Sequence, residues 1–347
     1  MRSLGFFSLG LISCLWADAA PKAEERPYDY DLFSKDRECE YIDLEALVFK
    51  LLNNQAVGAV SSSPSQQTSA TTDAKTHDEI KNIYWQWRPG FRVTLGYFNA
   101  PKYWEVMGQY TWFEDHGHKT VNSPNPSQNY LKVGCFLPAS DGFSSASNPV
   151  QKIHAKADLY YNDFSALVSR NFYPNPHLRL RVLGGLTSMW AHQRTELENT
   201  FTNLSNTLDS RFHSKYWGIG FKMGAVADWY WGKDFYLTGK VFWSIVTGRW
   251  NTDTKTTSSS GQLYQQVSDD AYKTTQNFQF IFGPSYQKSY EKMRWELFVG
   301  YELNAWLDAL TAYNYQAQNA AQSWVYPQKF FEDLVLTGVN VRLTFDF

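Results

Sequence analysis

The residues best suited to chemistry stand together at Asp115, His116 and His118. Imidazole and carboxylate groups at this spacing could bind a metal ion or form an Asp/His hydrolytic site. A solvated loop tip accounts for the same three residues more simply, and the other five histidines are scattered along the chain. The sequence has no Gly-rich phosphate loop, CxxC pair or nucleophile motif. We therefore expect no enzymatic activity, no metal and no cofactor.

Charged side chains form a second group, and they keep to one side of alternating segments. In residues 85–97 the apolar side chains share one face, while Arg88 and Arg92 share the other. Residues 217–231 repeat the pattern, with Lys222 opposite a row of apolar side chains. A period of two is typical of β-strands with two different faces.

If the apolar faces point outward, the charged faces line an interior that carries both signs. The expected lumen-lining residues are Arg88, Arg92, Glu105, Lys156, Asp158, Arg179, Arg181, Lys222, Asp228, Lys240, Arg294, Glu296, Glu302 and Arg342. Mixed charge suits a diffusion pore with weak ion selectivity, because rings of charge at the narrowest point select ions. The alternative is an interior closed by ion pairs.

About ten alternating segments fill residues 41–347. Long polar loops are expected at 53–83, 115–151, 196–212, 251–273 and 308–331. Short turns, rich in residues that tight turns need, are expected at 99–102, 173–176, 232–233 and 288–290. This order predicts an all-β fold, a transmembrane antiparallel β-barrel of about 10 strands with short periplasmic turns and long extracellular loops. A hairpin hidden in 115–151 would raise the count to about 12.

Three features favour lipid rather than water outside the apolar faces. The segments are about twice the usual strand length of roughly 5 to 6 residues, and crossing a bilayer takes about 9 to 11. Large aromatic residues gather at both segment ends, as in interfacial girdles. The last segment ends on Phe345 and Phe347, which look like the signal read by the outer-membrane assembly machinery. A basic residue turned toward the membrane midplane would cost roughly 2 to 4 kcal/mol, so the charges should point inward.

The N-terminal residues predict export. Residues 1–20 combine Arg2, an apolar stretch and a cleavage site of small residues, as a signal peptide does. The alternative is a lipoprotein signal over Leu11–Cys14, which would leave a lipidated Cys14 at the new N-terminus. Residues 21–40 are expected to form a short periplasmic segment before the barrel of 41–347. A formal net charge of −2 creates no field that would attract nucleic acid.

Two further expectations concern the two barrel ends. Cys39 should lie at the periplasmic rim and Cys135 in an extracellular loop, too far apart to bond within one chain. Residues 305–313 carry apolar side chains at helical spacing. They predict a short helix that either enters the mouth as a constriction or caps the rim.

Several segments resemble a known family: 87–93, 104–106 with 110–112, and 179–185. They are similar to the Legionella-type major outer-membrane protein family, which includes MOMP-like proteins of chlamydia-related bacteria. The resemblance covers about residues 41–347 and implies a pore-forming barrel in the bacterial outer membrane.

The sequence therefore predicts a porin-like protein that lets small solutes or ions diffuse across the outer membrane. Barrels of about eight strands are filled by their own side chains, and open channels are usual near sixteen, so ten is narrow. The alternative is a non-conducting surface barrel acting in adhesion or as a structural protein, and a hydrolase is more remote. The expected partners are outer-membrane lipid, lipopolysaccharide and the assembly machinery, and a homo-oligomer is left open.

Overall fold

The computed structural model describes most of the chain from Glu38 onward, and nearly all of the described residues are in β-strands. The described residues are 38–52, 56–62, 77–99, 102–123, 130–133, 150–175, 177–201, 207–232, 234–290, 293–317 and 325–347. Within them the structure contains no α-helix, and no helix long and apolar enough to cross a membrane. The predicted signal peptide lies outside the described residues, as does most of the segment 21–40.

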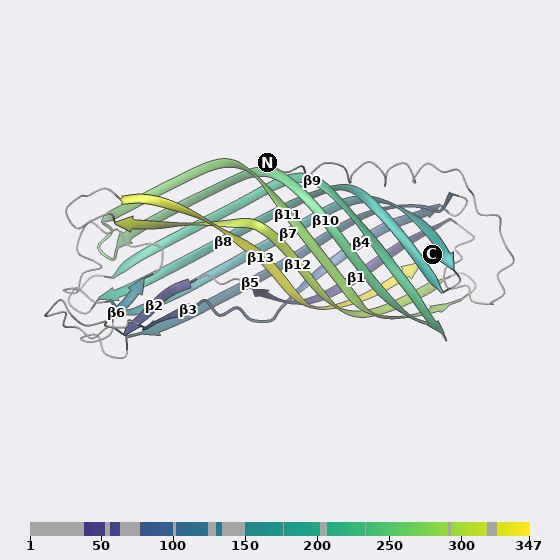
Figure 1. Ribbon diagram of the computed structural model, residues 1–347, viewed down its shortest axis with the longest axis horizontal. Helices are drawn as coiled ribbons and strands as arrows, with labels where there is room; N and C mark the ends of the chain where they lie inside the picture. Colours follow the sequence, from purple (N-terminus) through teal and green to yellow (C-terminus); the bar gives the residue numbers. More distant parts are fainter. Residues whose placement is uncertain are drawn as a thin grey trace, which may run out of the picture.

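Ten strands close into a ring of antiparallel pairs, in the order β1, β4, β5, β7, β8, β9, β10, β11, β12 and β13, with β13 paired to β1. Their bounds are Cys39–Leu52, Arg88–Asn99, Trp104–Asn122, Val150–Asn175, Leu178–Phe201, Leu208–Gly232, Phe235–Ser258, Leu263–Ser289, Arg294–Ala317 and Val325–Asp346. Figure 1 shows the closed sheet along its length. The predicted barrel of ten strands is confirmed.

Three short strands stand beside the ring. They are β2 (Ala56–Ser62), β3 (His77–Asn82) and β6 (Tyr130–Val133), at the end of the barrel away from the C-terminus (Figure 1). They pair in the order β3, β2, β6, and β6 reaches β7 through a single residue pair. The strand hidden in 115–151 is therefore β6, which leaves the ring at ten.

The strands from β7 to β12 are longer than a bilayer crossing requires, at 24 to 27 residues each. The prediction of long loops was wrong for three segments, because most of their residues belong to strands. These segments are 196–212, 251–273 and 308–331. Their Ser, Thr and Asn residues are typical of loops. Here the backbone is paired to neighbouring strands, and in residues 251–258 the side chains alternate between buried and more exposed positions.

The helix expected at 305–313 was also wrong, because these residues belong to β12. The pairing of β12 with β13 shifts register between Trp306 and Leu310. Within the shift, Asp308 has a φ of 53° and donates its backbone N–H to the Asp333 carboxylate at 2.8 Å. The irregularity leaves Trp306 and Leu310 both buried, which produces the apolar spacing of four that resembled a helix.

The outer surface changes character along the barrel. On β9 the outward side chains from Trp217 to Trp231 are apolar, whereas the four outward positions that end at Lys215 are polar. On β7 the outward side chains are mostly polar up to Asn162 and mostly apolar from Phe164 onward. We call the part with the apolar outer surface, which ends in the short turns, the lipid-facing zone. The rest is the projecting zone.

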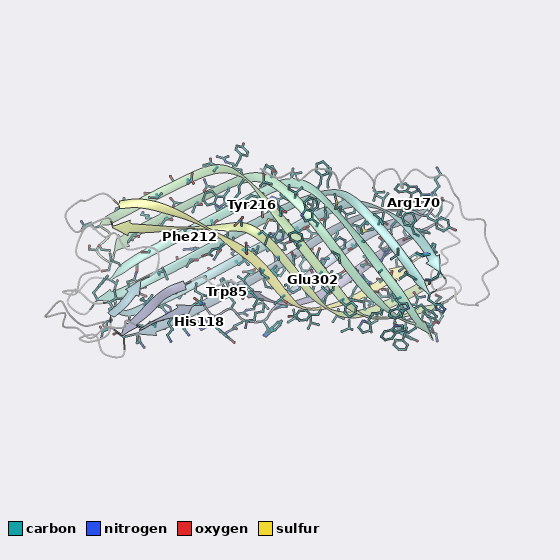
Figure 2. The ribbon with its side chains drawn as sticks, in the orientation of Figure 1. Trp85, His118, Arg170, Phe212, Tyr216 and Glu302 are labelled. Carbon is teal, nitrogen blue, oxygen red and sulfur yellow. The ribbon has the colours of Figure 1, made fainter. Side chains whose placement is uncertain are left out.

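The interior changes in the opposite sense. The interior of the projecting zone holds a large cluster of buried apolar residues, among them Phe49, Phe113 and Phe212, together with uncharged polar side chains such as Gln193 and Thr252. Charged side chains dominate the interior of the lipid-facing zone. In Figure 2 Phe212 lies toward one end of the barrel, whereas Glu302 lies farther along toward the other.

Candidate functional site

The interior of the lipid-facing zone is the candidate site, and Arg92 on β4 is at its centre. Its guanidinium donates to Glu45 on β1 at 2.7 Å and to Glu302 on β12 at 2.6 Å. Asn340 on β13 donates to both carboxylates at 2.8 Å, and Gln279 on β11 donates to Glu302 at 2.6 Å. All five side chains are buried. Buried charges need close partners, and this network supplies them from five strands.

A second network lies nearer the short turns. Its ion pairs are Arg179 with Asp228, Arg342 with Glu296, and Arg294 with Asp346. The Arg179–Asp228 contact measures 2.7 Å and the Arg342–Glu296 contact 2.5 Å. Arg181 lies between Glu105 and Asp228, at 3.7 and 3.8 Å. Every charge in this group therefore has a partner of opposite sign.

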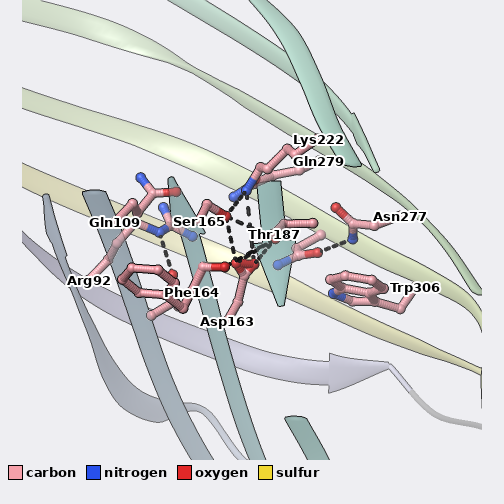
Figure 3. Close-up of polar contacts among 12 residues, drawn as sticks. Arg92, Gln109, Asp163, Phe164, Ser165, Thr187, Lys222, Asn277, Gln279 and Trp306 are labelled. Carbon is pink, nitrogen blue, oxygen red and sulfur yellow. Dashed lines mark hydrogen bonds and ion pairs between the residues drawn. The ribbon is translucent and has the colours of Figure 1, made fainter. Parts of the chain in front are cut away.

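A third group surrounds Lys222 on β9 (Figure 3). The Lys222 ammonium lies 4.0 Å from an Asp163 oxygen and 3.5 Å from the Ser165 hydroxyl. Ser165 donates to Asp163 at 3.0 Å. The ammonium also stands 5.1 Å from the centroid of the Phe242 ring. Lys222 is thus held by longer contacts than Arg92.

A hydrogen bond crosses the whole ring at the boundary between the two zones. Trp306 on β12 donates its indole N–H to the Tyr161 hydroxyl on β7 at 3.0 Å, and Asn304 donates to the same oxygen at 3.4 Å. β7 and β12 are five strands apart in a ring of ten, so they stand on opposite walls. Tyr161 and Trp306 are each 1% exposed. The interior is therefore filled from wall to wall at this level.

A small cavity lies among these charges in the described part of the chain. It measures about 30 Å³ and is lined by residues of both signs, including Glu105, Arg181, Glu296 and Arg342. A buried water needs roughly 10 to 15 Å³ on this measure, so the cavity has room for about two. It can hold water, but it is far smaller than a passage for solutes.

Twelve of the fourteen expected lining residues point inward. Those in the lipid-facing zone are Arg92, Glu105, Arg179, Arg181, Lys222, Asp228, Lys240, Arg294, Glu296, Glu302 and Arg342. Arg88 stands at the edge of the projecting zone, where its side chain is 40% exposed and 3.8 Å from Asp115.

The expectation for Lys156 and Asp158 was wrong, because both face outward on β7 between the buried Ala155, Ala157 and Leu159. The expectation requires charges to point inward along the whole strand. In the projecting zone the outside is water, so the charged side of the strand is the outer one. The rule holds only where lipid surrounds the barrel.

Some interior residues are not among those predicted from the sequence. Asp163 and Ser165 lie on the inward side of β7, and the alternation of that strand could have placed them there. The contact between Tyr161 and Trp306 had no such signal, because it depends on which strands face each other across the ring.

The Asp/His group of β5 is divided between two faces. His116 and His118 face outward, whereas Asp115 is 0% exposed and faces inward. The His116 ring contacts Asp158 at 2.7 Å through Nδ1 and Glu114 at 3.1 Å through Nε2. Among the described residues, no group of three or more His, Cys, Asp or Glu side chains is arranged to hold a metal ion. Asp115 therefore cannot act jointly with either histidine.

The two ends of the described chain meet at the short-turn end of the barrel. Phe345 faces outward near the end of β13, and Phe347 is 66% exposed. The Phe347 N–H donates to the Glu40 carbonyl at 2.9 Å. Cys39 opens β1 at this same end, and Cys135 lies outside the described residues.

Comparison with known families decides the class of protein. Residues 41–347 match the family described as the Legionella pneumophila major outer membrane protein precursor. The chain belongs to this family. The match confirms the resemblance seen in the sequence, and this Legionella-type barrel is an outer-membrane protein.

Solved outer-membrane barrels resemble this Legionella-type chain only weakly. The outer membrane protease OmpT from Escherichia coli shares 9% identity, with a TM-score of 0.43 over 89% of this chain and 96% of that one. A FadL homologue from Pseudomonas aeruginosa shares 7% identity, with a TM-score of 0.25 over 90% of each chain. An anion-selective porin from Comamonas acidovorans shares 9% identity, with a TM-score of 0.13 over 90% of this chain and 100% of that one. No curated protein matches the chain. Similarities this weak do not indicate the activity of this chain.

Proposed function

We propose that this barrel is closed at rest and serves as a non-conducting structural protein of the outer membrane. The observation that carries the proposal is the Trp306–Tyr161 hydrogen bond of 3.0 Å across the ring. A water-filled passage would have to separate these two buried side chains. Ten strands enclose a space that side chains can fill, which supports a closed interior.

The layers on either side of the bridge support the same function. On the projecting side the interior is packed with apolar side chains such as Trp250, which is 0% exposed. On the other side, Arg92 pairs with Glu45 and Glu302. Separating such a buried pair leaves uncompensated charge, at a cost of about 3 to 5 kcal/mol. Opening a passage would disturb all three layers.

A narrow, gated ion pore is the second candidate. The charged interior with its cavity of about 30 Å³ favours it, because charges of both signs can lower the barrier for small ions. The pore-forming character implied by the family resemblance points the same way. In such a pore the Tyr161–Trp306 contact would be the gate.

Single-channel conductance in planar bilayers separates the two candidates. The full-length mature protein should be silent, whereas the double variant Tyr161→Ala, Trp306→Ala should conduct. Trp250→Ala is the matched control, because it removes a buried indole whose N–H donates to Ser214 on the neighbouring strand β9. Steady conductance from the unmodified protein would reject the closed barrel and support the pore.

We further propose that the protein has no enzymatic activity. The placement of His116 and His118 on the face opposite Asp115 supports this. The test is to replace both histidines with Gln and follow proteolysis of surface peptides by cells that carry the barrel. A cleavage activity that disappears in this variant would overturn the proposal.

The expected partners remain part of the proposal. Outer-membrane lipid would surround the lipid-facing zone, and lipopolysaccharide would meet the polar side chains at the zone boundary. The assembly machinery would read the C-terminal strand through Phe345 and Phe347. Deleting both phenylalanines should reduce insertion into the outer membrane, measured by surface proteolysis. Cross-linking in intact cells would show whether copies associate.

A further inference from the structure

The outer face of the lipid-facing zone is hollowed beside the turn between β7 and β8. A groove of about 540 Å³ runs across β8, β9, β10 and β11. Its floor consists of Ala227 and Gly239, which are paired across β9 and β10, and Trp229 and Phe282 stand beside it. A Cβ added to Gly239 would meet only Phe282, at 3.8 Å, so no protein atom fills the floor. Ligand pockets typically measure roughly 300 to 1,000 Å³.

The groove is oblique to the membrane. Its lower end, which is the end nearer the periplasmic short turns, is lined by Leu178, the first residue of β8. Its upper end is Phe282, seven residues before Ser289, where β11 ends. At about 3.3 Å per residue and a strand tilt of about 45°, the upper end lies roughly 15 Å farther into the bilayer. The groove thus connects the rim with the hydrocarbon region.

Its two ends differ in chemistry. Asn175 and His177, at the lower end, are exposed and polar, and the His177 ring stacks on Tyr230 with centroids 6.3 Å apart. The upper end is bounded by apolar side chains such as Leu237 and Phe282. A polar end at the rim and an apolar end inside the bilayer match an amphiphile that enters from the membrane surface.

We propose that this groove binds one acyl chain of a phospholipid of the periplasmic leaflet, with the headgroup beside Asn175 and His177. Lipid already surrounds this zone, and the chain would replace missing dispersion contacts along Ala227 and Gly239. A second copy of the barrel is a poorer occupant, since a stable interface needs roughly 800 Å² from each partner and the groove is a local hollow. The proposal is independent of whether the lumen conducts.

Native mass spectrometry of the full-length mature protein tests the proposal, with palmitoyl-oleoyl phosphatidylethanolamine and phosphatidylglycerol supplied in mild detergent. Gly239→Leu fills the floor of the groove. Gly184→Leu is the matched control, because Gly184 also faces lipid, lies outside the groove, and its added Cβ would meet only a backbone oxygen at 3.8 Å. The unmodified protein and the control should retain one phospholipid that survives collisional activation. Gly239→Leu should show about tenfold less of this species.

Three outcomes would overturn the proposal. The unmodified protein could retain no phospholipid, or both variants could retain it equally. Gly239→Leu could also change the fraction of dimer and leave lipid retention unaltered, which would assign the groove to a contact between copies. Heat-modifiable migration on gels checks folding, and Ala227→Leu fills the same floor from β9 if Gly239→Leu fails to fold.

Discussion

The lipid-facing and projecting zones share one continuous sheet and have opposite polarity. On β9, Phe221 is 64% exposed while its neighbour Lys222 is 4% exposed. Six residues earlier on the same strand, Lys215 is exposed while its neighbour Tyr216 is 3% exposed. The backbone alternates in the same way at both places. The medium outside therefore determines whether the apolar or the charged member of each pair faces out.

This difference explains how a strand of 25 residues keeps one register. A slip by one residue would turn Lys222 toward lipid, and in the projecting zone it would turn Tyr216 toward water. The two zones penalise the same slip for opposite reasons. The interior follows from the same constraint, since the projecting zone can build an apolar core, whereas the lipid-facing zone must bury its polar side chains together.

The largest expected effect comes from removing a charge inside the lipid-facing zone. Arg92→Met leaves Glu45 and Glu302 buried without their common partner. We expect the free energy of unfolding to fall by about 3 to 5 kcal/mol. Guanidinium unfolding in phospholipid vesicles, followed by tryptophan fluorescence, measures it.

The matched control for Arg92 adds Glu45→Gln and Glu302→Gln to the same variant. Because the triple variant has no uncompensated charge, it should recover most of the lost stability. A loss below about 1 kcal/mol in Arg92→Met alone would mean that water reaches this network, and the comparison of the two zones would lose its main support.

The second largest expected loss of stability comes from a charge added to the outer surface, and it should differ between the two zones. Phe221→Arg places a guanidinium against lipid and should destabilise the barrel by roughly 2 to 4 kcal/mol. His213→Arg, outward on the same strand in the projecting zone, should have little effect, because the side chain stays in water. Equal losses in the same unfolding assay would show that the zone boundary on β9 is misplaced.

Much of this architecture was predictable from residue alternation. Residues 217–231 separate charged from apolar side chains so clearly that strand, lipid-facing side and register follow together. The projecting zone was harder, because Ser, Thr and Asn in strands that face water resemble loop sequence. For the same reason the predicted direction of the Lys156 and Asp158 side chains was wrong. The side of the strand on which they lie depends on the medium outside the barrel and not on their own charge.

The site was predictable only as a set of inward positions. Alternation places Arg92 and Glu302 inside, but their sequence separation of 210 residues gives no sign that they form a pair. That pairing depends on strand order and stagger around the closed ring. The bridge from Tyr161 to Trp306 depends also on the irregular register of β12 beside Trp306.

A smaller effect should come from Asp115, a buried carboxyl inside the projecting zone. Burial raises the pKa of Asp115 to about 6, against about 3.9 in an unfolded chain. Between these values the folded state binds more protons, so stability should fall as pH rises from about 4 to 6, by up to about 3 kcal/mol. Asp115→Asn should lack this slope in unfolding measurements at both pH values. An identical pH profile for the variant would show that Asp115 is hydrated.

The smallest effect should come from an ion pair on the outside of the projecting zone. Arg194 donates to Glu196 at 2.5 Å, as short as many interior contacts, but the two side chains are 43% and 36% exposed. Exposed pairs contribute roughly 0.2 to 1 kcal/mol and are screened by salt. A double-mutant cycle with Arg194→Ala and Glu196→Ala should give a coupling in this range that fades in about 1 M salt. A coupling as large as that of Arg92 would mean that distance alone sets the strength of these pairs. A small one would assign the difference to the solvent that surrounds each zone.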